Sequence, residues 1–78
     1  MIKKVNSYSY YLTEKEKELI VYEIHKKGLS VPKYLKTVGV QAPYFNRILN
    51  GIDAVSKKMY EKAIKPLNVN IRIPEEFK

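Results

Sequence analysis

The sequence predicts an all-α domain with four to five helices, followed by a short C-terminal strand or an extended tail. Residues that favour helix N-caps precede successive stretches whose apolar residues recur at helical spacing. Glycines follow the ends of three of these stretches, where a left-handed residue can end a helix. The 78 residues include no cysteine, so packing and capping rather than disulfides must stabilise the fold.

The first helix is expected at about residues 13–27, after an N-terminal arm at residues 1–12. Thr13 and Glu16 have the spacing of a capping box, in which each side chain accepts a hydrogen bond from the other residue's amide. Ile20 and Ile24 give this helix an apolar stripe. We expect a charged, exposed face opposite, formed by Glu16, Glu18 and Glu23. In the arm, packing over the core is the expected role of Tyr8, Tyr10 and Tyr11, with partner contact and mobility as alternatives.

Two short helices follow, joined by a tight turn. Ser30 is an N-cap candidate for a helix of about eight residues that Gly39 ends, since glycine takes a positive φ without strain. A second helix is expected at about residues 41–50, with Phe45 and Ile48 facing inward. Residues 30–50 are therefore a candidate helix-turn-helix, a motif whose second helix fits the major groove of DNA.

A fourth helix is expected after Ser56, and Pro66 should kink or end it. Together, residues 13–68 form the predicted domain, a compact four- to five-helix helix-turn-helix unit. The tail, residues 69–78, begins with a strict alternation of apolar Val69, Ile71 and Ile73, which is typical of a short strand or an extended segment.

Positive charge is concentrated in the middle of the chain. The net charge is +7, and residues 26–65 carry nine basic side chains against only Asp53 and Glu61. Such a block favours a polyanionic partner, nucleic acid before an anionic membrane surface. A lysine-rich surface that serves only solubility is the alternative.

The stretch from Ser30 to Val69 resembles the Cro/repressor-type helix-turn-helix of phage repressors and xenobiotic-response-element regulators. The residues that carry the resemblance are the hydroxyl cap Ser30, the turn Gly39-Val40, the apolar pair Phe45 and Ile48, the exit Asn50-Gly51, and Leu67-Asn68-Val69. The resemblance implies a sequence-specific transcriptional regulator of the kind that operates a phage lysogeny switch. Three residues depart from the family pattern: Leu35 replaces a small inner residue, Pro43 a hydroxyl donor, and Leu49 an acidic residue.

The resemblance also implies the contact residues. The helix at about 41–50 would read bases in the major groove of an operator through Gln41, Ala42, Tyr44, Asn46 and Arg47. Phosphates would be bound by Ser30, Lys33, Lys36, Asn50, Lys57 and Lys58. Arginine pairs with guanine, and glutamine or asparagine with adenine, while phosphate contacts fix register without reading sequence. Alternatives are an ion-paired or solvated surface for Arg47 and simple helix capping for Gln41.

An enzyme is not expected, and neither is a metal or another cofactor. His25 is the only histidine, and no nucleophile motif, carboxylate pair or metal-ligand cluster accompanies it. The longest apolar run, Leu19 to Tyr22, is far shorter than a membrane span, and Lys3 and Lys4 precede no signal-peptide core. A cytoplasmic protein is therefore expected, with no membrane and no small-molecule substrate.

Two functions remain open, with an antitoxin of similar fold as a lesser alternative. The first is the DNA-binding regulator described above, as a homodimer on a two-fold operator. Pairing through residues 69–77 is the expected interface, and packing of this tail on its own core is the alternative. The second is a protein-binding antirepressor or modulator of repression that grips a repressor's DNA-binding domain. Pro43, Tyr44 and Phe45 favour the second function, because they make the start of this helix more apolar than base readout requires.

Overall fold

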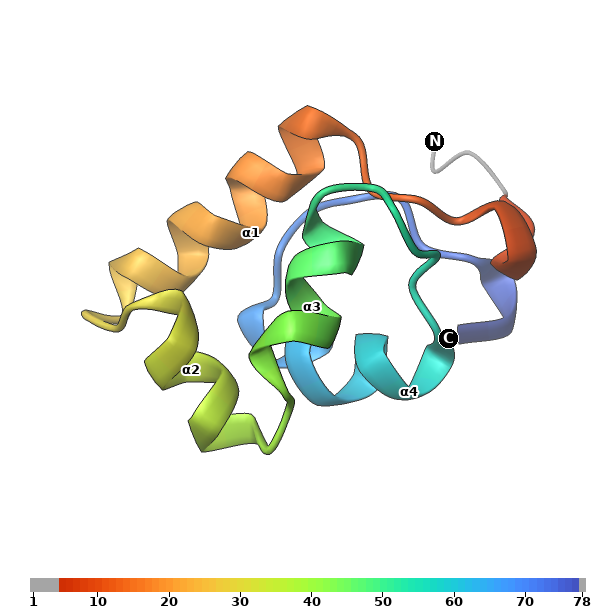
Figure 1. Ribbon diagram of the computed structural model, residues 1–78. Helices are drawn as coiled ribbons and strands as arrows, with labels where there is room; N and C mark the ends of the chain where they lie inside the picture. Colours follow the sequence, from red (N-terminus) through yellow and green to blue (C-terminus); the bar gives the residue numbers. More distant parts are fainter. Residues whose placement is uncertain (1–4, 78) are drawn as a thin grey trace.

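Four α-helices and four helical turns of other winding follow one another along residues 5–77, the part of the chain that the computed structural model describes (Figure 1). The α-helices are α1 (Glu14–Lys26), α2 (Val31–Val38), α3 (Ala42–Leu49) and α4 (Lys57–Met59). The other turns are η1 (Ser7–Ser9), the π-helical η2 (Tyr60–Ile64), η3 (Lys65–Leu67) and η4 (Glu75–Phe77). The predicted all-α class is confirmed, since residues 5–77 contain no strand.

Helix α1 begins with the predicted capping box. The Glu16 amide donates to Thr13 Oγ1 at 3.2 Å, and the Thr13 amide donates to Glu16 Oε1 at 2.9 Å. Ile20 and Ile24 are fully buried, as their spacing predicts. The helix ends before Gly28, which has φ +78°, so its predicted extent is correct to within one residue at each end.

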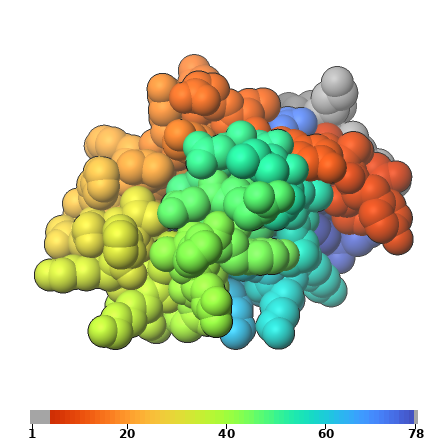
Figure 2. Space-filling model, viewed as in Figure 1, coloured from red at the N-terminus to blue at the C-terminus, as the bar shows by residue number. Residues whose placement is uncertain are grey.

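Helices α2 and α3 are joined by the three residues Gly39 to Gln41. Gly39 has φ +75°, and the next amide, that of Val40, donates to Leu35 O at 2.9 Å, which is the bond of a Schellman motif. Leu35 itself is buried, so the core accommodates the large residue at this position. Figure 2 shows the result: α3 (green) occupies the centre of one face, between α2 (yellow) and the cyan segment that contains α4.

The fourth helix changes its winding along its length. Ser56 caps α4, but the α-helical geometry gives way at Tyr60 to the π-helical η2, in which the Lys65 amide donates to Tyr60 O. Pro66 follows at once, and its ring would clash with a carbonyl one turn earlier in a regular α-helix. The buried Tyr34 hydroxyl donates to Ala63 O at 2.6 Å and thereby ties α2 to this widened turn.

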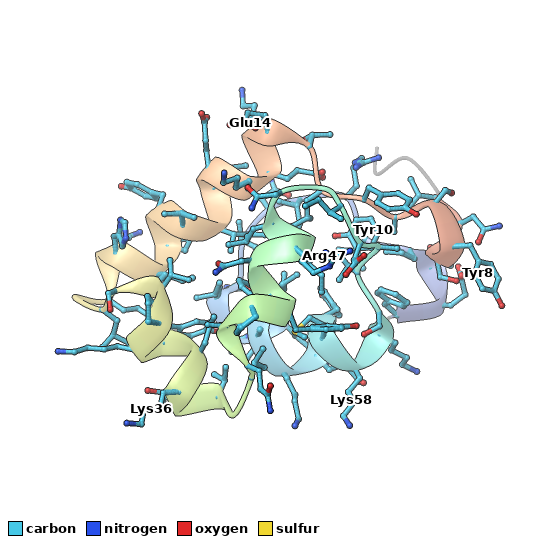
Figure 3. The ribbon with its side chains drawn as sticks, viewed as in Figure 1. Tyr8, Tyr10, Glu14, Lys36, Arg47 and Lys58 are labelled. Carbon is cyan, nitrogen blue, oxygen red and sulfur yellow. The ribbon has the colours of Figure 1, made fainter. Side chains whose placement is uncertain are left out.

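Only one of the three arm tyrosines packs into the core. Tyr10 is fully buried, and its ring meets the edge of Phe77 at a centroid distance of 5.9 Å. Burial raises the pKa of the Tyr10 hydroxyl. Tyr8 is 87% exposed and projects into solvent (Figure 3), and Tyr11 is also exposed, so the packing expectation is wrong for these two.

The described part of the tail, residues 69–77, is extended up to η4 and contains no strand, so the strand alternative is wrong. Ile71 and Phe77 are buried against the same core as the arm. A strand needs a neighbouring backbone for its amides, whereas the Arg72 amide donates to a side chain, Glu16 Oε2, at 3.2 Å. The alternation of apolar residues therefore reports contact with the core rather than a sheet.

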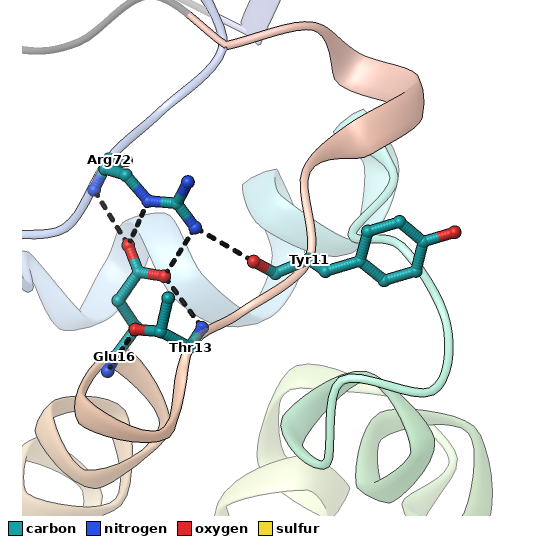
Figure 4. Close-up of polar contacts among 4 residues, drawn as sticks. All are labelled: Tyr11, Thr13, Glu16 and Arg72. Carbon is teal, nitrogen blue, oxygen red and sulfur yellow. Dashed lines mark hydrogen bonds and ion pairs between the residues drawn. The ribbon is translucent and has the colours of Figure 1, made fainter.

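Glu16 is buried, contrary to the expected exposed face of α1. Arg72 donates to its carboxylate through Nε (3.0 Å to Oε2) and Nη2 (2.8 Å to Oε1), and Nη2 also donates to Tyr11 O at 2.9 Å (Figure 4). Burial alone would raise the pKa of Glu16, but the hydrogen bonds from Arg72 and the Thr13 amide outweigh it and hold the pKa below its usual value. One carboxylate thus caps α1 and fixes the tail to its start.

Candidate nucleic-acid interface

Helix α3 has one buried face and one face in solvent. Phe45, Ile48 and Leu49 anchor the helix in the core. Of the predicted base-contacting side chains, that of Ala42 is half-buried. The other four are exposed: Gln41, Tyr44, Asn46 and Arg47. These four side chains are therefore open to a partner, as base readout would require.

Gln41 is the N-cap residue of α3, but its side chain makes no capping hydrogen bond. Gln41 and Tyr44 instead line an open surface pocket of about 370 Å³ between the turn and α4. Lys58 and Lys62 line the opposite side of this pocket. Lys62 was not among the predicted contact residues, although its position one turn after Lys58 could have suggested it.

The predicted phosphate-binding residues are exposed and belong to α2 with its N-cap, the end of α3 and the start of α4. Ser30, Lys33 and Lys36 belong to the cap and body of α2, Lys57 and Lys58 start α4, and Asn50 is the C-cap of α3. In Figure 3, Lys36 and Lys58 project from the same edge of the molecule, on either side of α3. Basic side chains therefore flank the exposed helix.

Two of these residues are already engaged within the chain. Ser30 Oγ accepts a hydrogen bond from the Lys33 amide at 3.3 Å as the N-cap of α2. Asn50 Oδ1 accepts one from Lys17 Nζ at 3.0 Å. Lys17 lies in α1, outside the basic block of residues 26–65, and no local pattern could have connected it with α3.

Arg47 forms a bidentate ion pair with Asp53. Its Nε donates to Asp53 Oδ2 at 2.8 Å, and its Nη2 donates to Asp53 Oδ1 at 3.2 Å. Hydrogen bonding to Arg47 lowers the pKa of the Asp53 carboxyl, and the same bond raises the pKa of the guanidinium. The pair is open to solvent, with 57% of the Arg47 side chain exposed.

The chain reversal after α3 places Asp53 beside Arg47. Gly51 has φ +74°, and the amides of Ile52 and Asp53 both donate to Arg47 O, at 2.9 and 3.4 Å. In the sequence, Asp53 stands out only as one of two acids in a basic block. The Asn50-Gly51 pair could have predicted this contact, because a left-handed turn at the end of a helix returns the next residues toward its last turn.

Among residues 5–77, no group of three or more histidine, cysteine, aspartate or glutamate side chains is placed to hold a metal ion. His25 is exposed in the last turn of α1. Within the same range, none of the helices has both the length and the apolar character needed to cross a membrane.

Comparison with known proteins found no family model, no curated protein and no solved structure that matches this chain.

Proposed function

We propose that the chain is a sequence-specific DNA-binding transcriptional regulator of the Cro/repressor type that inserts α3 into the major groove of an operator. The observation that carries the proposal is the exposed polar face of α3, with lysines of α2 and of the start of α4 beside it. A helix fits the width of the groove, and lysines on both sides would meet the two phosphate backbones.

The side chains fit base contacts by α3 and phosphate contacts by the lysines. Arg47 offers paired donors to guanine, Gln41 or Asn46 can pair with adenine, and Ala42 can touch a thymine methyl. The lysines at positions 33, 36, 57 and 58 would supply most of the affinity through release of counterions. Each good bidentate base contact contributes about 1–3 kcal/mol of discrimination.

We further propose a cytoplasmic protein that binds its operator as a homodimer, because one helix contacts few base pairs. Pairing through residues 69–77 is not supported, since Ile71 and Phe77 are buried in the chain's own core. A dimer would need another surface.

A second candidate is a protein-binding antirepressor that grips a repressor's DNA-binding domain. The observation that favours it is Tyr44, which is 46% exposed next to Pro43 and lines the pocket of about 370 Å³. Exposed aromatic side chains beside a pocket are typical anchors of protein interfaces.

The two candidates are separated by titrating labelled duplex DNA, including the flanking region of the chain's own gene, and following fluorescence anisotropy at about 50 and 200 mM salt. A DNA-reading regulator retains tight binding to one duplex at the higher salt, while its affinity for unrelated duplexes falls by roughly 10³-fold or more. Arg47→Ala should abolish the preference for that duplex, and Lys33→Ala should weaken binding to all duplexes alike. Weak binding that salt erases for every duplex would reject DNA reading and favour the antirepressor.

A further inference from the structure

Both arginines of the chain, Arg47 and Arg72, use the same edge of the guanidinium to hold a carboxylate. In each, Nε donates to one carboxylate oxygen and Nη2 to the other. A guanidinium has five N–H donors, and this edge uses two of them. The pairs differ in whether the remaining N–H donors at the far end of the guanidinium, on its terminal nitrogens, have a hydrogen-bond partner.

The far end of Arg72 is occupied, because Nη2 donates a further hydrogen bond to Tyr11 O at 2.9 Å. Within residues 5–77, the far end of Arg47 has no such partner, and its side chain is more exposed, at 57% against 34%. Asp53 therefore leaves three donors of Arg47 unused, including one N–H on each terminal nitrogen. Two parallel N–H groups are the fork that pairs with O6 and N7 of guanine.

We propose that Asp53 is a positioning residue that holds Arg47 with its terminal fork directed outward, for recognition of one guanine per protein chain. This inference rests on the proposed DNA-binding function and specifies the base that Arg47 reads. Free arginine side chains occupy many rotamers, and fixing one before binding avoids part of the entropy cost of ordering it on DNA.

The backbone supports this role. Because the amides of Ile52 and Asp53 are held by Arg47 O, the carboxylate is fixed relative to the helix turn that carries the guanidinium. A carboxylate near DNA also repels phosphates. Asp53 is one of only two acids in residues 26–65, so its pairing with the one arginine of that segment is the observation that calls for a role.

Glu61 provides the matched control. It is the other acid of this segment, it is exposed, and its replacement by alanine changes the net charge as Asp53→Ala does. General electrostatic attraction to DNA should therefore rise in both variants. Any difference in base preference between them reports the contact with Arg47.

The test selects duplexes from a randomised pool with the full-length wild-type chain and then measures binding of the selected duplex with each guanine changed in turn. Guanine is replaced by adenine and, separately, by 7-deazaguanine, which lacks the N7 acceptor. We expect one guanine per half-site whose replacement weakens wild-type binding about tenfold or more and leaves Arg47→Ala unaffected. Asp53→Ala should reduce that guanine preference about threefold to tenfold, whereas Glu61→Ala should retain it.

The outcomes distinguish this inference from the function on which it rests. If the wild type selects a sequence and Arg47→Ala loses the guanine preference, but Asp53→Ala keeps or increases it, the positioning role is rejected and DNA reading stands. A selected sequence with no guanine that depends on Arg47 also rejects the inference alone. If no sequence is selected, both proposals fall. Circular dichroism of each variant shows that the fold is intact.

Discussion

The two arginine–carboxylate pairs of this small protein have nearly the same geometry and lie in different surroundings. Arg72 binds a glutamate whose side chain is only 9% exposed, and it shares that carboxylate with the cap of α1. Arg47 binds an aspartate that is 35% exposed on the face that carries α3. Hydrogen-bond geometry alone therefore does not distinguish a structural pair from one that is available to a partner.

The surroundings make the distinction. Solvent screens exposed ion pairs, and such pairs contribute little to stability, whereas removal of one member of a buried pair leaves the other charge without a partner. We therefore expect Arg72 to act mainly on folding and Arg47 mainly on binding. Three changes test this contrast, beginning with the largest expected effect.

Replacement of Arg72 by alanine should lower the free energy of unfolding by about 2–4 kcal/mol, because Glu16 would remain buried without its main partner. Urea unfolding followed by far-UV circular dichroism measures this loss. Arg47→Ala is the matched control and should unfold close to wild type. Equal losses in the two variants would contradict the contrast.

Acidification should weaken the fold through Glu16. The folded pKa of Glu16 lies below its usual value of 4.5, so the unfolded chain binds more protons as pH falls past that value. The stabilisation is present above about pH 4.5 and disappears as pH falls through the folded pKa. Glu16→Gln should therefore unfold more easily than wild type at neutral pH, and the difference should shrink as the pH falls below 4.5 and through the folded pKa of Glu16.

Asp53→Asn is the control for this pH series. The pKa of the Asp53 carboxyl is also lowered, but this group is partly exposed to solvent. Its contribution to the free energy of unfolding should therefore be much smaller than that of Glu16. If the difference in unfolding free energy between Glu16→Gln and wild type does not shrink as the pH is lowered below 4.5, the buried pair is not its source.

The smallest expected effect is a difference between the NMR signals of the two arginine side chains. The Nε–H proton of Arg72 should exchange slowly with solvent and respond little to salt, since its partner is buried. The Nε–H proton of Arg47 should exchange faster, and its resonance should shift as salt rises to about 1 M and screens the exposed pair. Nitrogen-detected or proton-detected NMR of the two arginines checks this, and identical salt responses would be inconsistent with the different surroundings.

Local signals accounted for most of the helices and for the exposed face of α3. The capping box at Thr13, the serine caps and Gly39 act within a few residues of themselves, so the sequence shows them directly. The π-helical stretch before Pro66 was indicated only as a kink, because which carbonyls shift depends on packing.

Local sequence signals could not predict the two arginine–carboxylate pairs. Glu16 and Arg72 are 56 residues apart, and at α1 the glutamate reads as an ordinary exposed member of a charged helix. Arg47 and Asp53 are only six apart, but their pairing depends on the reversal at Gly51. Sequence periodicity predicted where the candidate interface lies, and only the fold shows how its arginine is held.

The arm and the tail meet on one side of the molecule (Figure 1). The Ser7 amide donates to Glu76 Oε2 at 3.3 Å, and the rings of Tyr10 and Phe77 are in contact. A short flexible linker could therefore join these segments, and the chain could be opened instead at the exposed turn around Gly28. Such a circular permutant would begin at α2 and would keep every helix and both arginine pairs. The exposure of α3 would then depend on the residues packed around it and not on the order of the elements along the chain.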